Sequence, residues 1–254
     1  MPGRIPVLIP VDSPDGERTV FDGNEPCPYL PDQVARTPLR LQLRSLGGTR
    51  FDELLDLGDR RVGRMLYRTA CPTCSACEPL RIPVDTFAPS RSQRRILRRN
   101  EDLRVEVGPA VFSADRLALF NRHKRERGLA RREQDTTQAG YEGWFVRSCV
   151  ETVEMRYLQG DRLVGVGIVD LGARDSSSVY FYFDPDESRR SLGTLSTLFE
   201  IEWLRRRGGR YHYLGLYVQA CRHLVYKASY FPHQRLVGGL WTTFAEPPPS
   251  PDLG

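Results

Sequence analysis

The sequence predicts an α+β fold in which helices cover a mixed β-sheet. Two observations lead to this class. In the second half of the chain, three strand-like runs precede a long helical segment, and a fourth strand-like run follows it. Two strands joined through a helix usually lie parallel in one sheet, so we expect the third and fourth strands to form a parallel pair. The order strand, strand, strand, helix, strand, helix therefore describes this half of the protein.

Two helices are predicted in the middle of the chain, over residues 90–100 and 113–128. Before residue 90 the hydrophobic periodicity is weak, and no regular element is predicted there. Ser90 or Ser92 is expected to cap the first helix, because a serine hydroxyl accepts a hydrogen bond from a free amide of the first turn. Ser113 has the same place before the second helix.

The elements after residue 150 are separated by clear turn signals. A hairpin is predicted over residues 151–172, because two strand-like runs flank the turn Gln159-Gly160-Asp161. The elements that follow are a strand at 177–186, a long helix at 188–209, a strand at 211–218 and a short final helix at 219–229.

Composition describes an ordinary globular chain of 254 residues with a formal net charge of +5. No apolar run approaches the roughly 20 residues that a membrane helix needs, so no membrane partner is expected. The first 20 residues are too interrupted by proline to resemble a signal peptide. A cytoplasmic location is therefore expected, where the six cysteines are thiols or metal ligands rather than disulfides.

Cys71, Cys74 and Cys77 form the pattern C-x2-C-x2-C, in which two-residue gaps on a loop let thiolates converge on one metal. Cys27 is the best fourth ligand, because it also lies beside a proline in a loop-like segment. A structural zinc and an iron–sulfur cluster use the same ligands, so both stay open. The alternative is a set of inert or redox-active thiols without metal.

A concentrated positive charge follows this motif. Five arginines recur at i, i+3, i+4, i+7 and i+8 and therefore lie on one helical face: Arg91, Arg94, Arg95, Arg98 and Arg99. We name these five residues the arginine face. Like charges at this spacing cost about 0.2–0.5 kcal/mol per pair, and no acidic residue separates them. Such a face is typical of contact with nucleic-acid phosphates, with a solvated charged surface as the alternative.

Other local patterns carry weaker signals. Residues 189–194, "RRSLGT", precede the long helix, and Gly193 would let a phosphate or a carbonyl oxygen approach the free amides of its first turn. The aromatic run 180–183 is mostly core, and one or two of its rings could line a pocket. His212, His223 and His233 are each candidate bases without a partner at motif spacing. No catalytic triad, phosphate-binding Walker loop or HExxH motif occurs.

Four segments together resemble the aminoacyl-tRNA–protein transferases of the N-degron pathway, in particular the bacterial branch that moves leucine onto N-terminal Asp or Glu. The segments are "CPYLPDQVARTPLR", "RVGRMLYRTACPTCSACEPLRIPVDTFAPSRSQRRILRRN", "YFYFDPDESRRSLGT" and "YHYLGLYV…YKASYFP". The resemblance runs from about Cys27 to Leu240. In the last segment this chain departs from the family pattern at Tyr217 and at His223-Leu224, whereas Tyr226 and Lys227 match.

The resemblance implies an architecture and a reaction. It implies an N-terminal cysteine-bearing domain over residues 1–108, a GNAT-like (acetyltransferase-type) domain over 109–245 and a disordered tail over 246–254. The implied reaction transfers leucine from aminoacyl-tRNA to the α-amine of proteins that start with Asp or Glu, which marks them for degradation. The chemistry requires no cofactor, since the ester on tRNA is already activated. The alternatives are an arginyl-tRNA donor, a CoA-dependent N-acetyltransferase and a non-catalytic RNA-binding module with a structural metal.

The resemblance also assigns roles to residues. The arginine face would hold the tRNA acceptor arm, and the cysteine site would organise loops near the acceptor peptide. A cation is needed for the acceptor's acidic side chain, and Arg68, Arg81 or Lys227 could supply it. No residue is assigned as general base. The predicted substrate-binding set is Arg68, Arg81, Tyr182, Gly193, Tyr226 and Lys227.

Overall fold

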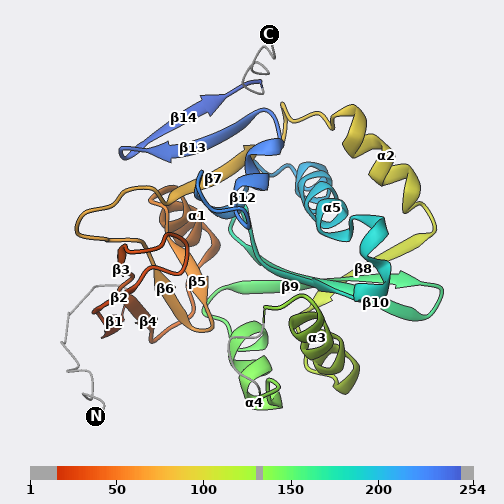
Figure 1. The fold of residues 1–254 in the computed structure, drawn as a ribbon, viewed down its shortest axis with the longest axis horizontal. Coiled ribbons are helices and arrows are strands. Elements are labelled where there is room, and N and C mark those ends of the chain that lie inside the picture. The colour runs from red at the N-terminus through yellow and green to blue at the C-terminus, as the bar shows by residue number, and fades with distance from the viewer. Residues whose placement is uncertain (1–15, 130–133, 247–254) are drawn as a thin grey trace.

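The computed structural model describes residues 16–129 and 134–246 and is built around an 8-stranded sheet (Figure 1). The sheet has the order β14-β13-β7-β12-β11-β10-β9-β8. In chain order its strands are β7 (Glu78–Pro83), β8 (Leu103–Pro109), β9 (Glu151–Gln159), β10 (Arg162–Leu171), β11 (Ser176–Phe183), β12 (Tyr211–Tyr217), β13 (His233–Val237) and β14 (Leu240–Phe244). This mixed sheet with its covering helices confirms the predicted α+β class.

The parallel pair predicted from the sequence is present. Strands β11 and β12 run parallel, and the other neighbouring strands described in this sheet are antiparallel. Helix α5 (Leu192–Arg206) connects the two parallel strands, after a 3-10 turn at Pro185–Arg190. The long helix therefore begins four residues later than residue 188, because the segment before it winds more tightly. The hairpin of β9 and β10 also matches its prediction.

Helices cover both faces of the sheet. Helices α2 (Arg91–Arg99) and α5 lie on one face, and α3 (Ala114–Glu126) with the short α4 (Gln138–Tyr141) lies on the other (Figure 1). On the first face, Leu198 and Ile201 of α5 pack against Leu80 and Ile82 of β7. On the second face, Phe120 of α3 packs in an aromatic cluster with Tyr182 of β11. A π-helical segment, Glu142–Val146, continues α4.

The predicted helix caps are confirmed. Ser90 caps α2 through a reciprocal pair of hydrogen bonds with Gln93, and the Ser113 hydroxyl accepts from the amide of Arg116 at the start of α3. The predicted final helix is shorter than expected, a 3-10 turn at Val225–Ser229. Every helix in the described ranges is too short or too polar to traverse a bilayer.

The first part of the chain contains elements that periodicity did not predict, because most are only three to five residues long. A 4-stranded sheet has the order β1-β4-β6-β5, a second sheet pairs β2 with β3, and one helix, α1, accompanies them. Their bounds are β1 (Glu17–Phe21), β2 (Asn24–Pro26), β3 (Val34–Arg36), β4 (Leu39–Gln42), α1 (Gly48–Asp56), β5 (Arg60–Val62) and β6 (Met65–Tyr67).

Two strands from the first 108 residues, β7 and β8, belong to the large sheet. Strand β7 begins directly after the cysteine motif and lies between β12 and β13. The chain therefore enters the large sheet immediately after Cys77. The division at residues 108 and 245 stays a prediction, and the tail call for 246–254 falls outside the described residues from 247 onward.

Candidate active site

A pocket of about 710 Å³ opens where the two parallel strands part. Strands β11 and β12 are paired only at Ser176 with His212 and at Ser177 with Tyr213. Beyond this point each strand continues without the other, and residues 178–181 and 214–216 line the space between them. The first turns of α5 form another wall. We call this space the central pocket.

Arg60 reaches the central pocket from β5 in the N-terminal part of the chain. Its Nη2 atom donates a hydrogen bond of 2.7 Å to the carbonyl oxygen of Ser178. Its Nη1 atom is buried and has no hydrogen-bond partner among the described residues, and no described carboxylate pairs with Arg60. A buried guanidinium with a free donor needs an acceptor, since burying an unpaired charged donor is costly.

Lys227 reaches the same pocket from the 3-10 turn after β12. Its Nζ donates to the carbonyl oxygen of Leu216 at 2.9 Å. Burial, followed by the charge of Arg60, lowers the pKa of Lys227 to about 7. A Cβ atom built on Gly215 would lie 2.9 Å from Arg60 Nη2 and 3.4 Å from Lys227 Nζ. The buried Arg60 and the half-buried Lys227 therefore converge on Gly215, which suits an anionic ligand.

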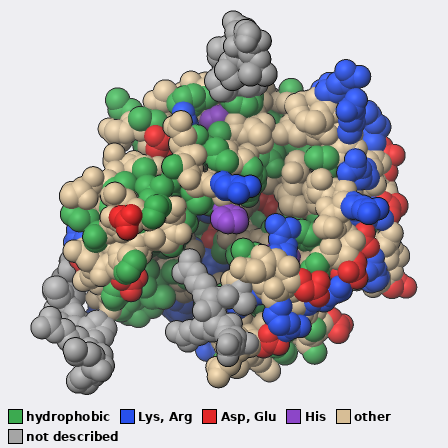
Figure 2. All heavy atoms as spheres, in the orientation of Figure 1, with side chains coloured by type: hydrophobic (Ala, Val, Ile, Leu, Met, Phe, Trp, Pro, Cys, Tyr) green, Lys and Arg blue, Asp and Glu red, His purple; other side chains and the backbone are tan. Residues whose placement is uncertain are grey.

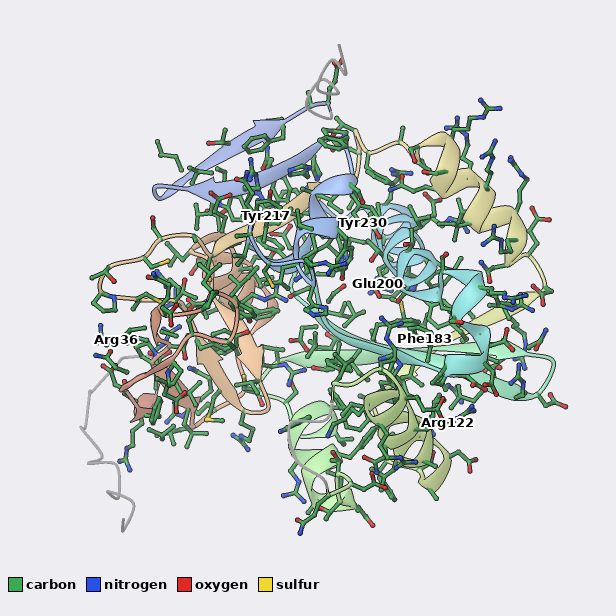
Figure 3. The ribbon with its side chains drawn as sticks, in the orientation of Figure 1. Arg36, Arg122, Phe183, Glu200, Tyr217 and Tyr230 are labelled. Carbon is green, nitrogen blue, oxygen red and sulfur yellow. The ribbon has the colours of Figure 1, made fainter. Side chains whose placement is uncertain are left out.

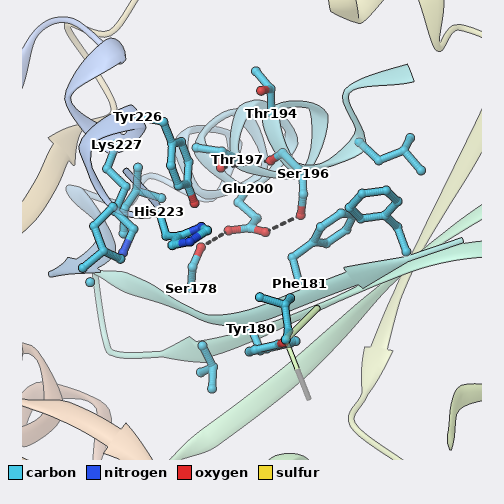
Figure 4. Close-up of a pocket in the computed structure, with 18 of the residues that line it drawn as sticks. Ser178, Tyr180, Phe181, Thr194, Ser196, Thr197, Glu200, His223, Tyr226 and Lys227 are labelled. Carbon is cyan, nitrogen blue, oxygen red and sulfur yellow. Dashed lines mark hydrogen bonds between the residues drawn. The ribbon is translucent and has the colours of Figure 1, made fainter. Parts of the chain in front are cut away.

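An acidic group faces the pocket from α5. Glu200 is 3% exposed, and its carboxylate accepts hydrogen bonds from the hydroxyls of Ser178 and Ser196 (Figure 4). It also lies 2.9 Å from Nε2 of His212, which is fully buried and bonds through Nδ1 to Ser176 Oγ at 2.8 Å. Figure 3 shows Glu200 on α5 near the centre of the molecule.

Three residues of the predicted substrate-binding set line the central pocket: Gly193, Tyr226 and Lys227. Gly193 belongs to the first turn of α5, where a Cβ would meet no atom within 4 Å. The interpretation of residues 189–194 as an approach to the helix amides stays a prediction. His223 also lines the pocket, whereas His233 is buried and bonds to the carbonyl oxygen of Tyr230.

The other three residues of that set lie outside the lining of the central pocket. Arg68 pairs with Asp59 at 2.8 Å. Arg81 is 6% exposed and donates to Tyr213 and Gln234, and its guanidinium stacks on two aromatic rings. Tyr182 is fully buried on the opposite face of the sheet, where its hydroxyl bonds to that of Tyr141. The donors of Arg81 and the hydroxyl of Tyr182 are thus engaged within the protein.

The arginine face is exposed along α2, and none of its five side chains pairs with a described carboxylate. Figure 2 shows basic side chains gathered along the edge of the molecule that α2 forms. Ile96 and Leu97 point inward and pack on the core beneath α5. The end of α2 is bonded to the segment before α5, because Arg99 Nη1 donates to the carbonyl oxygen of Arg189 at 2.6 Å. This hydrogen bond joins one residue of the arginine face to the segment that precedes a wall of the central pocket.

The four predicted metal ligands, Cys27, Cys71, Cys74 and Cys77, are all half-buried. Cys27 directly follows β2, and the Cys71 thiol accepts a hydrogen bond of 3.5 Å from the amide of Arg36 in β3, the strand paired with β2. Burial, with smaller effects of Cys71, Cys27 and Cys74, raises the pKa of Cys77 to about 12. Within the described ranges, however, no three His, Cys, Asp or Glu side chains are gathered as a group that could hold a metal.

Arg60, Ser178, Ser196 and Glu200 are pocket residues that sequence reasoning did not single out. Arg60 is one of 35 arginines in the chain, and Glu200 lies among helical residues with no motif around it. Arg60 lies directly before the quoted segment that resembles a known family, which starts at residue 61. The position of Arg60 directly before this segment was the one available signal.

Comparison with known proteins identifies relatives along most of the chain. The family described as arginine-tRNA-protein transferase matches through its C-terminal part at residues 115–237 and through its N-terminal part at residues 25–95. The aspartate/glutamate leucyltransferase of Stenotrophomonas maltophilia (strain R551-3) is 38% identical over 240 residues, which cover 92% of this chain and 95% of the relative. The protein of that name from Chromobacterium violaceum is 34% identical over 221 residues, with 87% and 91% covered.

A partial likeness to solved structures was also found. The L-PGS structure from Bacillus licheniformis has a TM-score of 0.41 and 16% sequence identity, and the match covers 56% of this chain and 47% of that chain. The sequence matches cover more of the chain, since the two family parts match residues 25–95 and 115–237 and the relative from Stenotrophomonas maltophilia covers 92% of it. The chain therefore belongs to the arginine-tRNA-protein transferase family, a family of aminoacyltransferases.

Proposed function

We propose that this protein transfers leucine from leucyl-tRNA to the N-terminal α-amine of proteins that begin with Asp or Glu. Two findings support the proposal. Curated relatives of 34–38% identity carry the name aspartate/glutamate leucyltransferase. The central pocket also holds two basic side chains, the buried Arg60 and the half-buried Lys227, with no described carboxylate paired to either.

The two cations are the observation that carries the acceptor assignment. Arg60 offers its free Nη1 donor, and Lys227 shares the space above Gly215 with it. A carboxylate fits this arrangement, because a guanidinium and an ammonium can each donate to its two oxygens. An amide in its place would leave the charges uncompensated, so the pocket should reject Asn and Gln. Lys227, predicted from sequence, and Arg60 are thus our proposed receptor for the acidic side chain.

The main task of the protein in this reaction is to position the α-amine against the ester carbonyl. The ester that links leucine to tRNA is activated, and a reference α-amine has a pKa of about 7.7–8.0. Aligning the amine with the ester carbonyl can contribute about 7–11 kcal/mol through effective concentration. The open first turn of α5 at Gly193 offers backbone amides near the developing oxyanion.

We further propose that the arginine face binds the phosphates of the tRNA acceptor arm. The face is exposed and has no described acidic partners, and Arg99 bonds to the segment that leads into the pocket wall. A tRNA held there would have its backbone on α2 and its aminoacyl end directed toward Gly193. Phosphate contacts fix position without reading sequence.

Cys27, Cys71, Cys74 and Cys77 are proposed to hold a structural zinc ion or an iron–sulfur cluster. Thiolates are ligands for either group, and the β2–β3 pair brings Cys27 and Cys71 to the same part of the fold, because Cys27 follows β2 and Cys71 accepts a hydrogen bond from Arg36 in β3. Within the described residues no three such ligands form a group that could hold a metal. A bound metal would cross-link Cys27 to the motif before β7 and leave the transfer chemistry to the pocket. We propose a cytoplasmic location, because charged tRNA is found there.

The proposal is tested by offering the purified protein leucyl-tRNA, arginyl-tRNA or acetyl-CoA, together with peptides that begin with Asp, Glu, Asn, Ala or Lys. Mass spectrometry of the peptide identifies both the transferred group and its acceptor. Addition of leucine to Asp and Glu peptides, with little addition to Asn peptides, is the expected result. Preferential use of arginyl-tRNA would overturn the donor assignment alone, and turnover with acetyl-CoA but not charged tRNA would overturn the function.

A further inference from the structure

Glu200 is the one buried carboxylate among the described residues that line the central pocket. Three polar neighbours fix its carboxylate: Ser178 and Ser196 through their hydroxyls, and His212 through Nε2 at 2.9 Å. Tyr157 in turn donates to Ser196 Oγ at 3.2 Å, so the Ser196 hydrogen is directed to Glu200. The group is thus rigidly held at the pocket wall.

The carboxylate of Glu200 can accept one more hydrogen bond than its described neighbours donate. A carboxylate has about four lone-pair sites, and three are used by Ser178, Ser196 and His212. Ser178 and His212 contact Oε2, whereas Ser196 is the one described hydrogen-bond donor to Oε1, so Oε1 keeps a free lone pair on a residue that lines the central pocket. An ammonium group is the donor that best satisfies a desolvated carboxylate at such a position.

Ser178 links this acidic group to the cationic side of the pocket. Its carbonyl oxygen accepts from Arg60 Nη2 at 2.7 Å, and its hydroxyl donates to Glu200. Ser178 of β11 is therefore hydrogen-bonded both to the guanidinium of Arg60 and to the carboxylate of Glu200. An N-terminal Asp or Glu has a matching pair of charges, an α-ammonium and a side-chain carboxylate, on one residue.

We propose that Glu200 binds the α-ammonium of the acceptor and is the general base of the transfer, with Ser178, Ser196 and His212 as its positioning residues. This inference rests on the proposed function. Together with Arg60 and Lys227 it makes the central pocket bipolar, so the protein recognises the first residue of the acceptor as a zwitterion.

The proton balance follows from this arrangement. The α-ammonium gives one proton to the carboxylate of Glu200, and the neutral amine attacks the ester carbonyl carbon of leucyl-tRNA. A carbon–nitrogen bond forms, and the bond between that carbon and the ribose oxygen breaks. The second amine proton passes to the leaving ribose oxygen, which becomes a hydroxyl. Glu200 then releases its proton to solvent, and the products are an amide and uncharged tRNA.

The test compares wild type with Glu200→Gln in the full-length protein. Both proteins are assayed with an Asp peptide between pH 6.5 and 7.5, and the kcat/KM of the variant is divided by that of wild type at each pH, so that the titration of Lys227, which is common to both, cancels. This ratio should be about 10⁻²–10⁻⁴ at pH 6.5. It should then rise about tenfold per pH unit until the amine deprotonates at about 7.7–8.0. Glu202→Gln on the exposed side of α5, where Glu202 pairs with Arg206, is the matched control and should behave as wild type.

A second variant, Ser196→Ala, tests the proposal even if Glu200→Gln does not fold. Ser196→Ala removes one hydrogen bond to Glu200 and keeps its charge. The loss should move the acidic limb of the kcat/KM profile to higher pH, because a carboxylate with fewer donors is more basic. A purely structural Ser196 would leave this limb unchanged. A Glu200→Gln profile parallel to wild type, or an unmoved limb in Ser196→Ala, would overturn the proposal.

Peptide binding separates this inference from the proposed function. By fluorescence polarisation without tRNA, wild type should bind an Asp peptide with a free amine about 10- to 100-fold more tightly than its N-acetylated form, and Glu200→Gln should lose this preference. If no transfer of leucine occurs but the preference does depend on Glu200, the function fails and the ammonium site stands. An equal preference in both proteins would reject the site.

Discussion

Arg61 and Asp170 form an ion pair of 2.6 Å in which both side chains are at most 1% exposed. The pair joins β5 of the N-terminal part to β10 of the large sheet. Asp170 also accepts a hydrogen bond of 2.7 Å from Thr152, and Arg61 donates to the carbonyl oxygen of Gly63. Because Arg60 is the preceding residue of β5, this buried pair fixes the strand that carries Arg60 into the central pocket.

Asp170→Asn should therefore destabilise the protein strongly. The charge of Arg61 would stay buried without its partner, which typically costs about 3–5 kcal/mol of unfolding free energy. Urea denaturation measures the change. Glu53→Gln removes one member of an exposed pair with Arg50 and should cost no more than about 1 kcal/mol. A loss for Asp170→Asn as small as that of Glu53→Gln would contradict the anchoring role of the pair.

Lys227 should make recognition of the acidic side chain depend on pH. With a pKa of about 7, Lys227 is charged below this pH and neutral above it. The preference for an Asp over an Asn peptide should thus decrease as pH rises from 6 to 8. The ratio of the two kcat/KM values is the measure, because titration of the α-amine affects both peptides. In Lys227→Arg the charge persists, so the ratio should be independent of pH; a ratio that falls equally in both proteins would rule out Lys227 as the cause.

Gly215→Ala should displace the cationic receptor. A Cβ at this position would lie 2.9 Å from Arg60 Nη2, and the backbone φ of +87° disfavours a side chain. Arg60 would have to move, so we expect at least a tenfold loss in kcat/KM for Asp peptides. Gly108→Ala in β8 is the control, because a Cβ there meets no atom within 4 Å. Unchanged kinetics in Gly215→Ala would place the acceptor carboxylate elsewhere.

Replacing Arg94, Arg95 and Arg98 by Ala should weaken tRNA binding and reduce its dependence on salt. Each lost phosphate contact lowers the slope of log affinity against log salt by about 0.7–0.9. Filter binding at several salt concentrations gives the slope, and tRNAs of different sequence should respond alike. Replacement of the exposed Arg206 at the end of α5 by Ala serves as a control for overall charge. An unchanged slope would leave the arginine face as a solvated surface.

The cysteine set should be required for bound metal. Anaerobically purified protein is expected to contain zinc, or iron with sulfide, by elemental analysis. The combined change of Cys71, Cys74 and Cys77 to Ser should remove it, because neutral hydroxyls do not replace thiolates. Cys149→Ala should retain the metal, since Cys149 is fully buried in a separate apolar cluster. Full metal content in the triple variant would exclude this site.

Local signals in the sequence determined α2 and the strands and helices between residues 151 and 218. The turn at Gln159-Gly160-Asp161 sets the hairpin, and Ser90 caps α2 through Gln93, only three residues away. Such interactions join close neighbours in the chain, so their residues can be recognised without the fold. The resemblance of the cysteine motif and of "RRSLGT" to a known family identified the reaction class for the same reason.

Short elements escaped prediction because their stability comes from tertiary contacts. Strands β5 and β6 have three residues each, which is too short for an alternating pattern to be distinct. They form because Leu66 is fully buried in a cluster with α1 and Tyr213 of β12. The contacts that hold them lie far away in the sequence.

The site itself was decided by the tertiary structure. Arg60 and Ser178 are 118 residues apart in the chain, and Ser178 is 22 residues from Glu200, yet these three residues form one bonded group. Nothing in the local sequence distinguishes Arg60 from the other arginines, because its role depends on burial and on the absence of a carboxylate partner among the described residues. The sequence by itself identified the family and the parallel pair, and it singled out Lys227 as a candidate. Only the divergence of β11 from β12 created the space in which two cations and one carboxylate meet.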